Sequence, residues 1–412
     1  MPNRIKNILN QIEHFLLCAI VFVFPMDKRV IPIVIATYCG IFVLNGGIPA
    51  AYRVIKSKYL FFTTAYYAIL LIGIFNSSQI NAAWFDVEVK FSLLLFPFIF
   101  SARSLTRKQF SDILVWFIIG CLIATIICLT VAVFYYFDTY DESVFYYQEV
   151  SIFQHPSYFS MYLNFCIYVI YYFMVYDKQS FKIQSDVLSV IIIVIFSLFV
   201  VLLSSKIGLI TLFMVIFTGT IMWFLRSRAI FPSLIVFTML TSLIYISFNY
   251  SSYIQGRLEE AVFSLSDERV TFTTTGARVI IWKIGIELIK EKPLLGYGTG
   301  DVKSELINKY DEKGFSYLAG LKLNAHNQYL QMLIAIGILG SVFFWLYLYY
   351  PVLAPGFFKN MLYMGLITLI SFNFLTESML ETQAGVVFYA FFNAMFFFNM
   401  NNVVPISFKK KI

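Results

Sequence analysis

The chain has 412 residues, of which 60% are apolar and only 13% are charged, and its mean hydropathy is +0.78. In soluble globular domains roughly a quarter of the residues are charged, so this composition excludes the soluble enzyme classes. Gly and Pro are sparse, with 20 and 11 residues, which excludes fibrous and disordered classes. The 46 Phe and 28 Tyr suit packing inside a membrane and at its interfaces. The sequence therefore predicts an all-α membrane protein.

A helix that spans a bilayer needs about 20 mostly apolar residues. The sequence offers about twelve such segments, of which the first two form a tight hairpin around residues 26–29. The seventh and eighth are divided at Ser204, Ser205 and Lys206. In chain order, the predicted spans cover residues 12–25, 30–45, 59–76, 84–101, 112–137, 156–176, 187–205, 206–225, 230–248, 327–350, 358–375 and 384–400.

The basic residues of short loops predict the orientation of these spans. With the N-terminus in the cytoplasm, the inner segments carry sixteen Lys and Arg, whereas the short outer loops carry three, Lys28, Arg29 and Lys206. This bias favours an even number of spans with both termini inside. The net charge of +7 is then a signal for topology, and it gives no reason to expect nucleic acid as a partner.

One connection, residues 249–326, is long and polar and lies outside by this count, with ten basic and ten acidic residues. It contains two amphipathic helical patterns, at 277–290 and 301–313, separated by Pro293 and a glycine-rich turn. We expect one integral membrane domain in three parts. Residues 1–248 carry spans one to nine, 249–326 form the large loop, and 327–412 carry spans ten to twelve and a cytoplasmic tail.

The motifs for metals, disulfides and nucleotide phosphates are missing from the sequence. All five Cys fall inside apolar runs without a Cys-x-x-Cys pair, and there are only three His. Neither a Walker loop nor a strand-linked glycine fingerprint is present. We therefore expect no metal site and no cofactor.

A series of motif residues surrounds the end of the long connection. Arg278 lies one helical turn before Trp282, the segment PLLGYGTGD follows at 293–301, and the pair His326-Asn327 opens the tenth span. This series resembles the signature of the O-antigen ligase and O-antigen polymerase superfamily. Members of that superfamily are polytopic bacterial membrane proteins with about twelve spans and one large periplasmic loop. The likeness is specific over about 275–342.

Two further segments are similar to parts of that superfamily. The stretch SSKIGLITL at 204–212 resembles its Ser-Arg-Gly segment, with Lys206 in place of arginine and the glycine displaced to Gly208. The His155-Pro156 pair resembles a feature of some members. The resemblance implies that His326 and Arg278 are the catalytic residues and that four residues bind substrate: Lys206, Trp282, Asn327 and His155.

The chemistry of these side chains agrees with that implication. A lipid-linked sugar diphosphate is a double anion at a membrane surface, and basic groups there bind it and stabilise the leaving group. Arg278 offers a planar fork of donors, whereas Lys206 offers a point charge. A histidine, with an ordinary pKa near 6.5, can accept a proton from a sugar hydroxyl. The diphosphate already leaves readily, so neither a glycosidase carboxylate pair nor a metal is required.

Each candidate also has a structural explanation. Arg278 could be an interfacial charge that snorkels, Lys206 could flank the end of a span, and Trp282 could anchor a helix at the interface. His155 could cap the sixth span. A lone histidine such as His326 is usually a packing or surface residue.

Other polar residues near the outer side have simpler readings. Asp86 and Lys90 are spaced i, i+4 and can pair. Glu377 and Glu381, one turn apart, are expected in a solvated loop, with binding of the acceptor as the alternative. We expect a turn between two helices at Gly296, Gly298 and Gly300, with a phosphate-binding nest as the alternative.

The resemblance implies a metal-independent glycosyltransferase of the bacterial inner membrane with its site on the periplasmic face. It would move a glycan from undecaprenyl diphosphate to an acceptor hydroxyl. The acceptor is lipid A–core in a ligase, which we favour, and another lipid-linked repeat unit in a polymerase. A transporter of lipid-linked sugars is a second class, although no internal repeat supports it. A scaffolding protein is a third, in which Arg278 and His326 should point away from each other.

Overall fold

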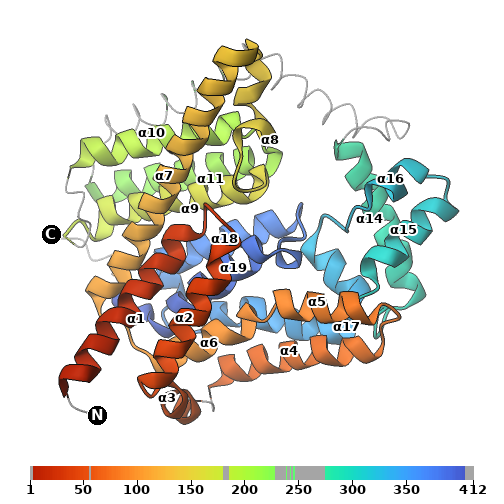
Figure 1. Ribbon diagram of the computed structural model, residues 1–412, viewed down its shortest axis with the longest axis horizontal. Coiled ribbons are helices and arrows are strands. Elements are labelled where there is room, and N and C mark those ends of the chain that lie inside the picture. The colour runs from red at the N-terminus through yellow and green to blue at the C-terminus, as the bar shows by residue number, and fades with distance from the viewer. Residues whose placement is uncertain are drawn as a thin grey trace.

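The computed structural model describes residues 3–54, 57–179, 185–227 and 274–403, together with three single positions between 227 and 274. Every regular element in these ranges is a helix (Figure 1). Six of the described helices are long and apolar enough to cross a membrane, and four shorter apolar helices accompany them. The expected all-α, multi-pass architecture is therefore confirmed in this coarser form, whereas the count of twelve spans remains a prediction.

Most predicted spans of the first half coincide with helices. The hairpin at residues 26–29 joins the first two, and the predicted division at Ser204–Lys206 separates α10 from α11. The helices are α1 (Asn3–Val23), α2 (Val30–Leu44), α3 (Gly47–Val54), α4 (Lys58–Phe75), α5 (Ile80–Val89), α6 (Ser92–Ala102), α7 (Arg107–Thr139), α8 (Tyr147–Val150), α9 (Pro156–Tyr176), α10 (Asp186–Leu202) and α11 (Lys206–Ser227).

In the second half, the predicted ninth span at 230–248, apart from the three single positions, and residues 249–273 of the large loop lie outside the described residues. The two amphipathic helices expected in that loop are present as α14 and α15. The helices are α14 (Thr274–Glu291), α15 (Val302–Glu312), α16 (Ser316–Leu321), α17 (Gln328–Tyr349), α18 (Met361–Phe374) and α19 (Gln383–Phe398).

The predicted single span at 84–101 is wrong, because the chain breaks there into α5 and α6 at Lys90. The Lys90 side chain is fully buried and pairs with Asp86, as the spacing predicted, and also with Glu381 at 3.0 Å. A buried charge in an apolar setting needs such partners. The break brings Lys90 to Glu381, which lies nearly 300 residues later in the chain.

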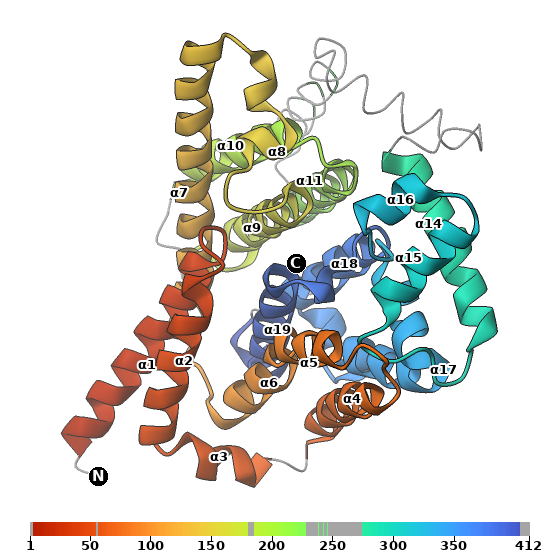
Figure 2. The ribbon, with the colours of Figure 1, turned by 45° about the vertical axis from the view of Figure 1, so that its right-hand side comes forward.

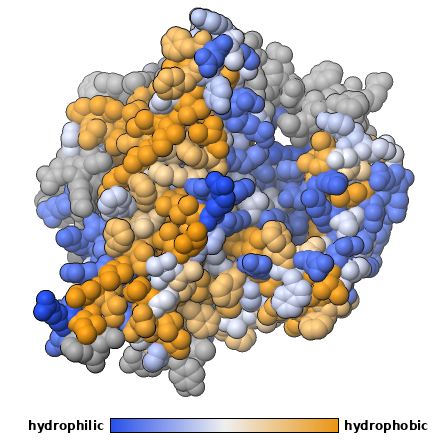
Figure 3. Space-filling view, in the orientation of Figure 1, coloured by the Kyte–Doolittle hydropathy of each residue, from blue (hydrophilic) through white to orange (hydrophobic). Residues whose placement is uncertain are grey.

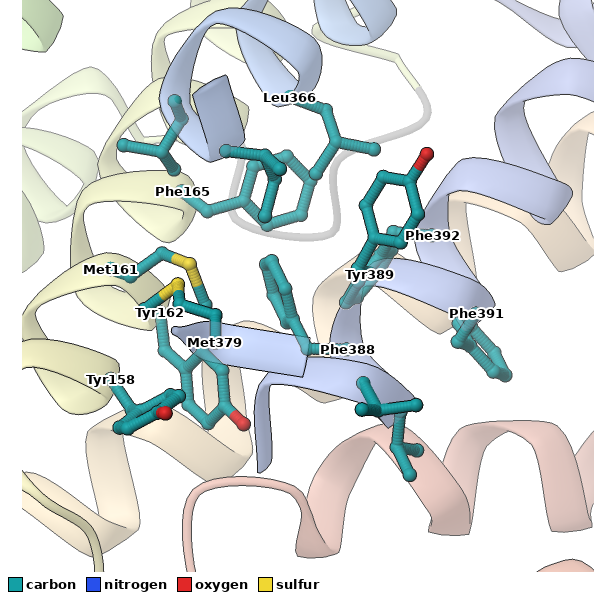
Figure 4. Close-up of a cluster of buried hydrophobic side chains, with 14 of the residues drawn as sticks. Tyr158, Met161, Tyr162, Phe165, Leu366, Met379, Phe388, Tyr389, Phe391 and Phe392 are labelled. Atoms are coloured by element: carbon teal, nitrogen blue, oxygen red, sulfur yellow. The ribbon is translucent and has the colours of Figure 1, made fainter. Parts of the chain in front are cut away.

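Helices α9 and α19 form the centre of the bundle. Eighteen consecutive residues of α9, 156–173, are buried. Aromatic rings from α9 and α19 pack together, with Tyr162 and Phe388 centroids 4.8 Å apart and Phe165 and Phe392 centroids 5.0 Å apart (Figure 4). Close packing of this kind holds membrane helices together, because lipid provides little hydrophobic drive between them. This packing gives the ends of α9 and α19 fixed positions.

The α14–α16 segment, residues 274–321, forms a lobe beside α5 and α17 (Figures 1 and 2). Hydrophilic side chains gather over this lobe, whereas hydrophobic side chains cover α1 and α7 (Figure 3). Ion pairs join α14 to α15, with Lys309 to Glu291 at 2.8 Å and Lys313 to Glu287 at 2.7 Å. The lobe is therefore a folded unit with its own internal contacts.

The turn at 293–300 fastens this lobe to α17. Gly337 interrupts α17 with φ +61° and ψ −172°, which frees backbone groups that the turn then satisfies. The amides of Tyr297 and Gly298 donate to the carbonyls of Ile334 and Ala335, both at 2.9 Å. After the turn, the Asp301 carboxylate accepts from two backbone amides at the start of α5, at 2.6 and 2.7 Å. The glycines of this turn thus pack against protein backbone, in agreement with the prediction of a structural turn between two helices.

Candidate functional site

Four of the six predicted site residues line one cavity of about 200 Å³. These residues are His155, Lys206, Arg278 and His326, and they come from segments far apart in the sequence. The cavity lies where the N-terminal ends of α9, α11, α14 and α17 come together. Because helix N-termini carry partial positive charge, their convergence adds to the two cationic side chains. The cavity is thus suited to an anionic ligand.

Local backbone features place each of these side chains. His155 is the N-cap of α9, with Pro156 at the first helical position, and its ring accepts a weak hydrogen bond from Ser157 N at 3.4 Å. Lys206 begins α11 after Ser204, whose φ is +47°. His326 has φ +42° and lies one residue before the N-cap of α17. Residues held in the left-handed region concentrate at functional sites, because the surrounding structure must hold them there.

A buried carboxylate that the sequence analysis did not select joins these residues. Glu377 lies in the connection between α18 and α19, and its side chain is only 6% exposed. One carboxylate oxygen accepts from Arg278 Nη2 at 2.6 Å and from Ser157 Oγ at 3.1 Å. The other lies 3.3 Å from His326 Nδ1. Glu377 therefore contacts both predicted catalytic residues.

The electrostatics of Glu377 follow from these contacts. Burial by itself raises the pKa of this carboxyl, but the hydrogen bond from His326 and the positive charge of Arg278, with electrostatic contributions from the His326 and His155 rings, outweigh it. Together they lower the pKa of Glu377 to about 2. The group is therefore an anion throughout the physiological range.

The expectation that Glu377 lies in a solvated loop is wrong. The apolar run ends just before it, but its carboxylate turns back into the protein to meet Arg278 and His326. One sequence signal could have identified it. A carboxylate at the end of a span, in a chain with unassigned cations at the same level, is costly unless it pairs with them.

Trp282 and Asn327 do not line this cavity. Trp282 lies one turn beyond Arg278 and is partly buried, and its indole N–H has no hydrogen-bond acceptor among the described residues. Asn327 caps α17, since its side-chain oxygen accepts from the amides of Tyr329 and Leu330 at 2.9 and 3.0 Å. Its amide group donates to the Leu375 carbonyl at 3.0 Å. The polar atoms of Asn327 thus hold the chain that carries His326. Substrate binding by Trp282 and by Asn327 remains a prediction.

A larger groove of about 1080 Å³ adjoins the cavity, and His155 lines both. Residues of α2, α5 and α6 and of the chain before α9 line it, and most are apolar or aromatic, such as Trp84, Phe85 and Phe153. Lys28 lies on its wall. An apolar groove beside a cationic cavity matches the two parts of an amphipathic anion.

In the part of the chain that the structure describes, no group of three or more His, Cys, Asp or Glu side chains is arranged to hold a metal ion. The donors at the cavity are instead suited to phosphate oxygens: a guanidinium, an ammonium group and imidazoles.

Residues 191–345 match one family model, Wzy_C, which is described as O-antigen ligase. The matched range contains Lys206, Arg278 and His326, whereas His155 and Glu377 lie outside it. A search of curated proteins finds no match to the chain.

Proposed function

We propose that this chain, whose residues 191–345 match the O-antigen ligase family model, is a membrane glycosyltransferase that transfers a glycan from undecaprenyl diphosphate to an acceptor hydroxyl. The observation that carries the proposal is the convergence of Lys206, Arg278 and His326 on one cavity. These side chains supply the two functions that the reaction needs, which are an anion site and a base.

In this proposal the diphosphate of the donor lies against Arg278 and Lys206. Arg278 gives one guanidinium nitrogen to Glu377 and keeps further N–H donors for phosphate oxygens. His326 accepts the proton of the acceptor hydroxyl as its oxygen attacks the anomeric carbon. The bond from that carbon to the diphosphate breaks, and the leaving group takes the electron pair. Fixed cations stabilise the charge that develops there.

The adjoining apolar groove is the proposed path for the lipid chain of a substrate. A polyprenyl chain needs an apolar surface that the membrane can reach, and the groove is lined mainly by such side chains. The α14–α16 segment and residues 249–273 then form the predicted large loop on the periplasmic side, opposite both termini. Catalysis is proposed to be independent of metal.

We favour the ligase reaction, with lipid A–core as the acceptor, because the matched family model carries that description. The polymerase reaction, with another lipid-linked repeat unit as acceptor, uses the same groups and is the alternative. A scaffolding role predicts that Arg278 and His326 point apart, whereas both contact Glu377. A transporter site is expected near the bilayer midplane, whereas this cavity lies at helix ends.

The direct test supplies the purified chain in lipid nanodiscs with an undecaprenyl-diphosphate-linked glycan and one acceptor at a time. Lipid A–core and a second lipid-linked repeat unit are the two acceptors. Transfer to lipid A–core alone supports the ligase reaction, and chain extension alone supports the polymerase alternative. No transfer to either acceptor by well-folded protein would contradict the proposal.

A further inference from the structure

The chain around His326 is docked onto the connection that carries Glu377. Asn327 N donates to Ser378 Oγ at 3.2 Å, and Leu380 N donates to Gln328 Oε1 at 2.6 Å. Gln328 Nε2 in turn donates to Glu381 at 3.3 Å. These contacts, with that of Asn327 to the Leu375 carbonyl, hold residues 326–328 against residues 375–381.

This docking maintains an uncommon backbone conformation at His326. Its φ of +42° lies in the left-handed region, which a residue with a side chain adopts only when neighbouring contacts hold it. Its backbone amide donates to Asn324 Oδ1 at 3.1 Å. The position of the ring is thus determined by the fold around it.

The ring contact defines which nitrogen can act as a base. Glu377 is ionised and can only accept hydrogen bonds, so its contact with His326 Nδ1 places the ring proton on Nδ1. The lone pair is then on Nε2, which has no hydrogen-bond partner among the described residues. Nε2 is therefore the atom that can take a proton from a bound hydroxyl.

We propose that Glu377 is the positioning residue of the base: it holds His326 in the Nδ1–H form and stabilises the imidazolium that forms during transfer. This inference rests on the proposed function. The acceptor hydroxyl gives its proton to Nε2, the hydroxyl oxygen bonds to the anomeric carbon, and the diphosphate leaves with the electron pair of the broken bond. The imidazolium later releases the proton to water. The second oxygen of Glu377 holds Arg278 beside the same reaction centre.

The competing explanation is that Glu377 only fastens the α14–α16 segment to the bundle. The chain offers a matched control for that role in Asp177, at the other end of α9. Asp177 is 3% exposed and accepts from Arg107 Nη2 at 2.6 Å, the same distance as the Glu377–Arg278 contact. No histidine contact of Asp177 accompanies that pair in the described structure. Asp177→Asn therefore removes an ion pair with an equally buried carboxylate, although Arg107 is more exposed than Arg278, without touching the base.

The experiment measures kcat, KM and the pH dependence of kcat for Glu377→Gln, Glu377→Asp and Asp177→Asn in nanodiscs. Glu377→Gln should lower kcat by roughly 10²–10⁴-fold, because the amide carries no charge and its NH2 group can donate to Nδ1, which places the ring proton on Nε2. KM should change much less than kcat. Glu377→Asp should restore part of the rate, and Asp177→Asn should lower stability while kcat per folded molecule is retained.

The pH profile distinguishes a role of Glu377 in positioning the base from a role in attaching the α14–α16 segment to the bundle. The ring contacts Glu377, while Arg278, Lys206 and His155 line the same cavity as His326, and Glu377 is the one anion among these four. Glu377→Gln removes the carboxylate contact of the ring, so its pH profile should differ from that of the wild type. Asp177→Asn should leave the profile unchanged. A Glu377→Gln enzyme with the kcat and the profile of Asp177→Asn would overturn the proposal.

A second readout does not depend on activity. The chain has three histidines, so ¹⁵N-histidine NMR with substitutions of His14 and His155 assigns the His326 ring signals. We expect the Nδ1–H form in the wild-type protein and a mixture of forms in Glu377→Gln. An Nε2–H form in the wild type would refute the positioning role even if transfer is observed. A wild type that has the Nδ1–H form but transfers no glycan would instead count against the proposed function.

Discussion

Substitution of Gly337 by Ala should loosen the attachment of the α14–α16 segment to α17. Gly337 has φ +61° and ψ −172°, a conformation that is essentially restricted to glycine and costs other residues about 1–3 kcal/mol. A Cβ at this position would also overlap the backbone of Leu294 and Leu295. Overpacking typically costs a further ~1–3 kcal/mol. The combined loss of roughly 2–6 kcal/mol is a large part of the usual stability of a folded domain, about 5–15 kcal/mol.

Two other glycines separate these contributions. Gly314 has φ +79° with open space around it, so Gly314→Ala should cost only the backbone part, about 1–2 kcal/mol. Gly320 lies in α16 with open space and no positive φ, so Gly320→Ala should be neutral or slightly stabilising. The assay is the thermal inactivation half-life in one fixed detergent, because membrane proteins commonly unfold irreversibly. Equal half-lives for the Gly337 and Gly320 variants would refute this reasoning.

Three further outcomes are expected. Arg278→Lys should transfer glycan poorly, because the planar fork of donors is lost, whereas Lys206→Arg should retain activity. Initial transfer rates at matched expression measure both variants. A faster Arg278→Lys than Lys206→Arg would contradict the proposed roles of the two cations. Reporter fusions at Ser266 and at the C-terminus should lie on opposite sides of the membrane, and the same side for both would refute the span count. The lowered pKa of Glu377, about 2 against an ordinary 4.5, should give the folded state about 3 kcal/mol that is present above pH 4.5 and lost as the pH falls toward 2. Thermal stability measured against pH should accordingly fall less steeply with acid in Glu377→Gln than in the wild type.

The helices were predictable to the extent that lipid determines them. Long apolar runs with few charges specify spanning helices locally, so segments such as 112–137 and 156–176 coincide with α7 and α9. The break between α5 and α6 was not predictable in this way. It depends on Glu381, a partner of Lys90 that is remote in sequence, and hydropathy along the chain contains no information on such a pair.

The site was predictable where motifs of the chain resemble those of a known family. That resemblance implied Arg278, Lys206 and His326, whose chemistry suits phosphate binding and proton transfer, and the fold places all three at one cavity. Glu377 was missed because its role depends on burial. An exposed glutamate at the end of a span and a buried one that joins an arginine to a histidine look alike in the sequence.

The measurement that tests the central claim most directly is single-turnover glycan transfer by His326→Ala from a purified undecaprenyl-diphosphate-linked donor. Wild type and variant are compared at matched amounts of folded protein, in the presence of EDTA. Loss of the base should slow transfer by roughly 10²–10⁴-fold, while donor binding is retained through Arg278 and Lys206. Near-normal turnover by His326→Ala would contradict the account, and loss of wild-type activity in EDTA would show that a metal takes part in the reaction.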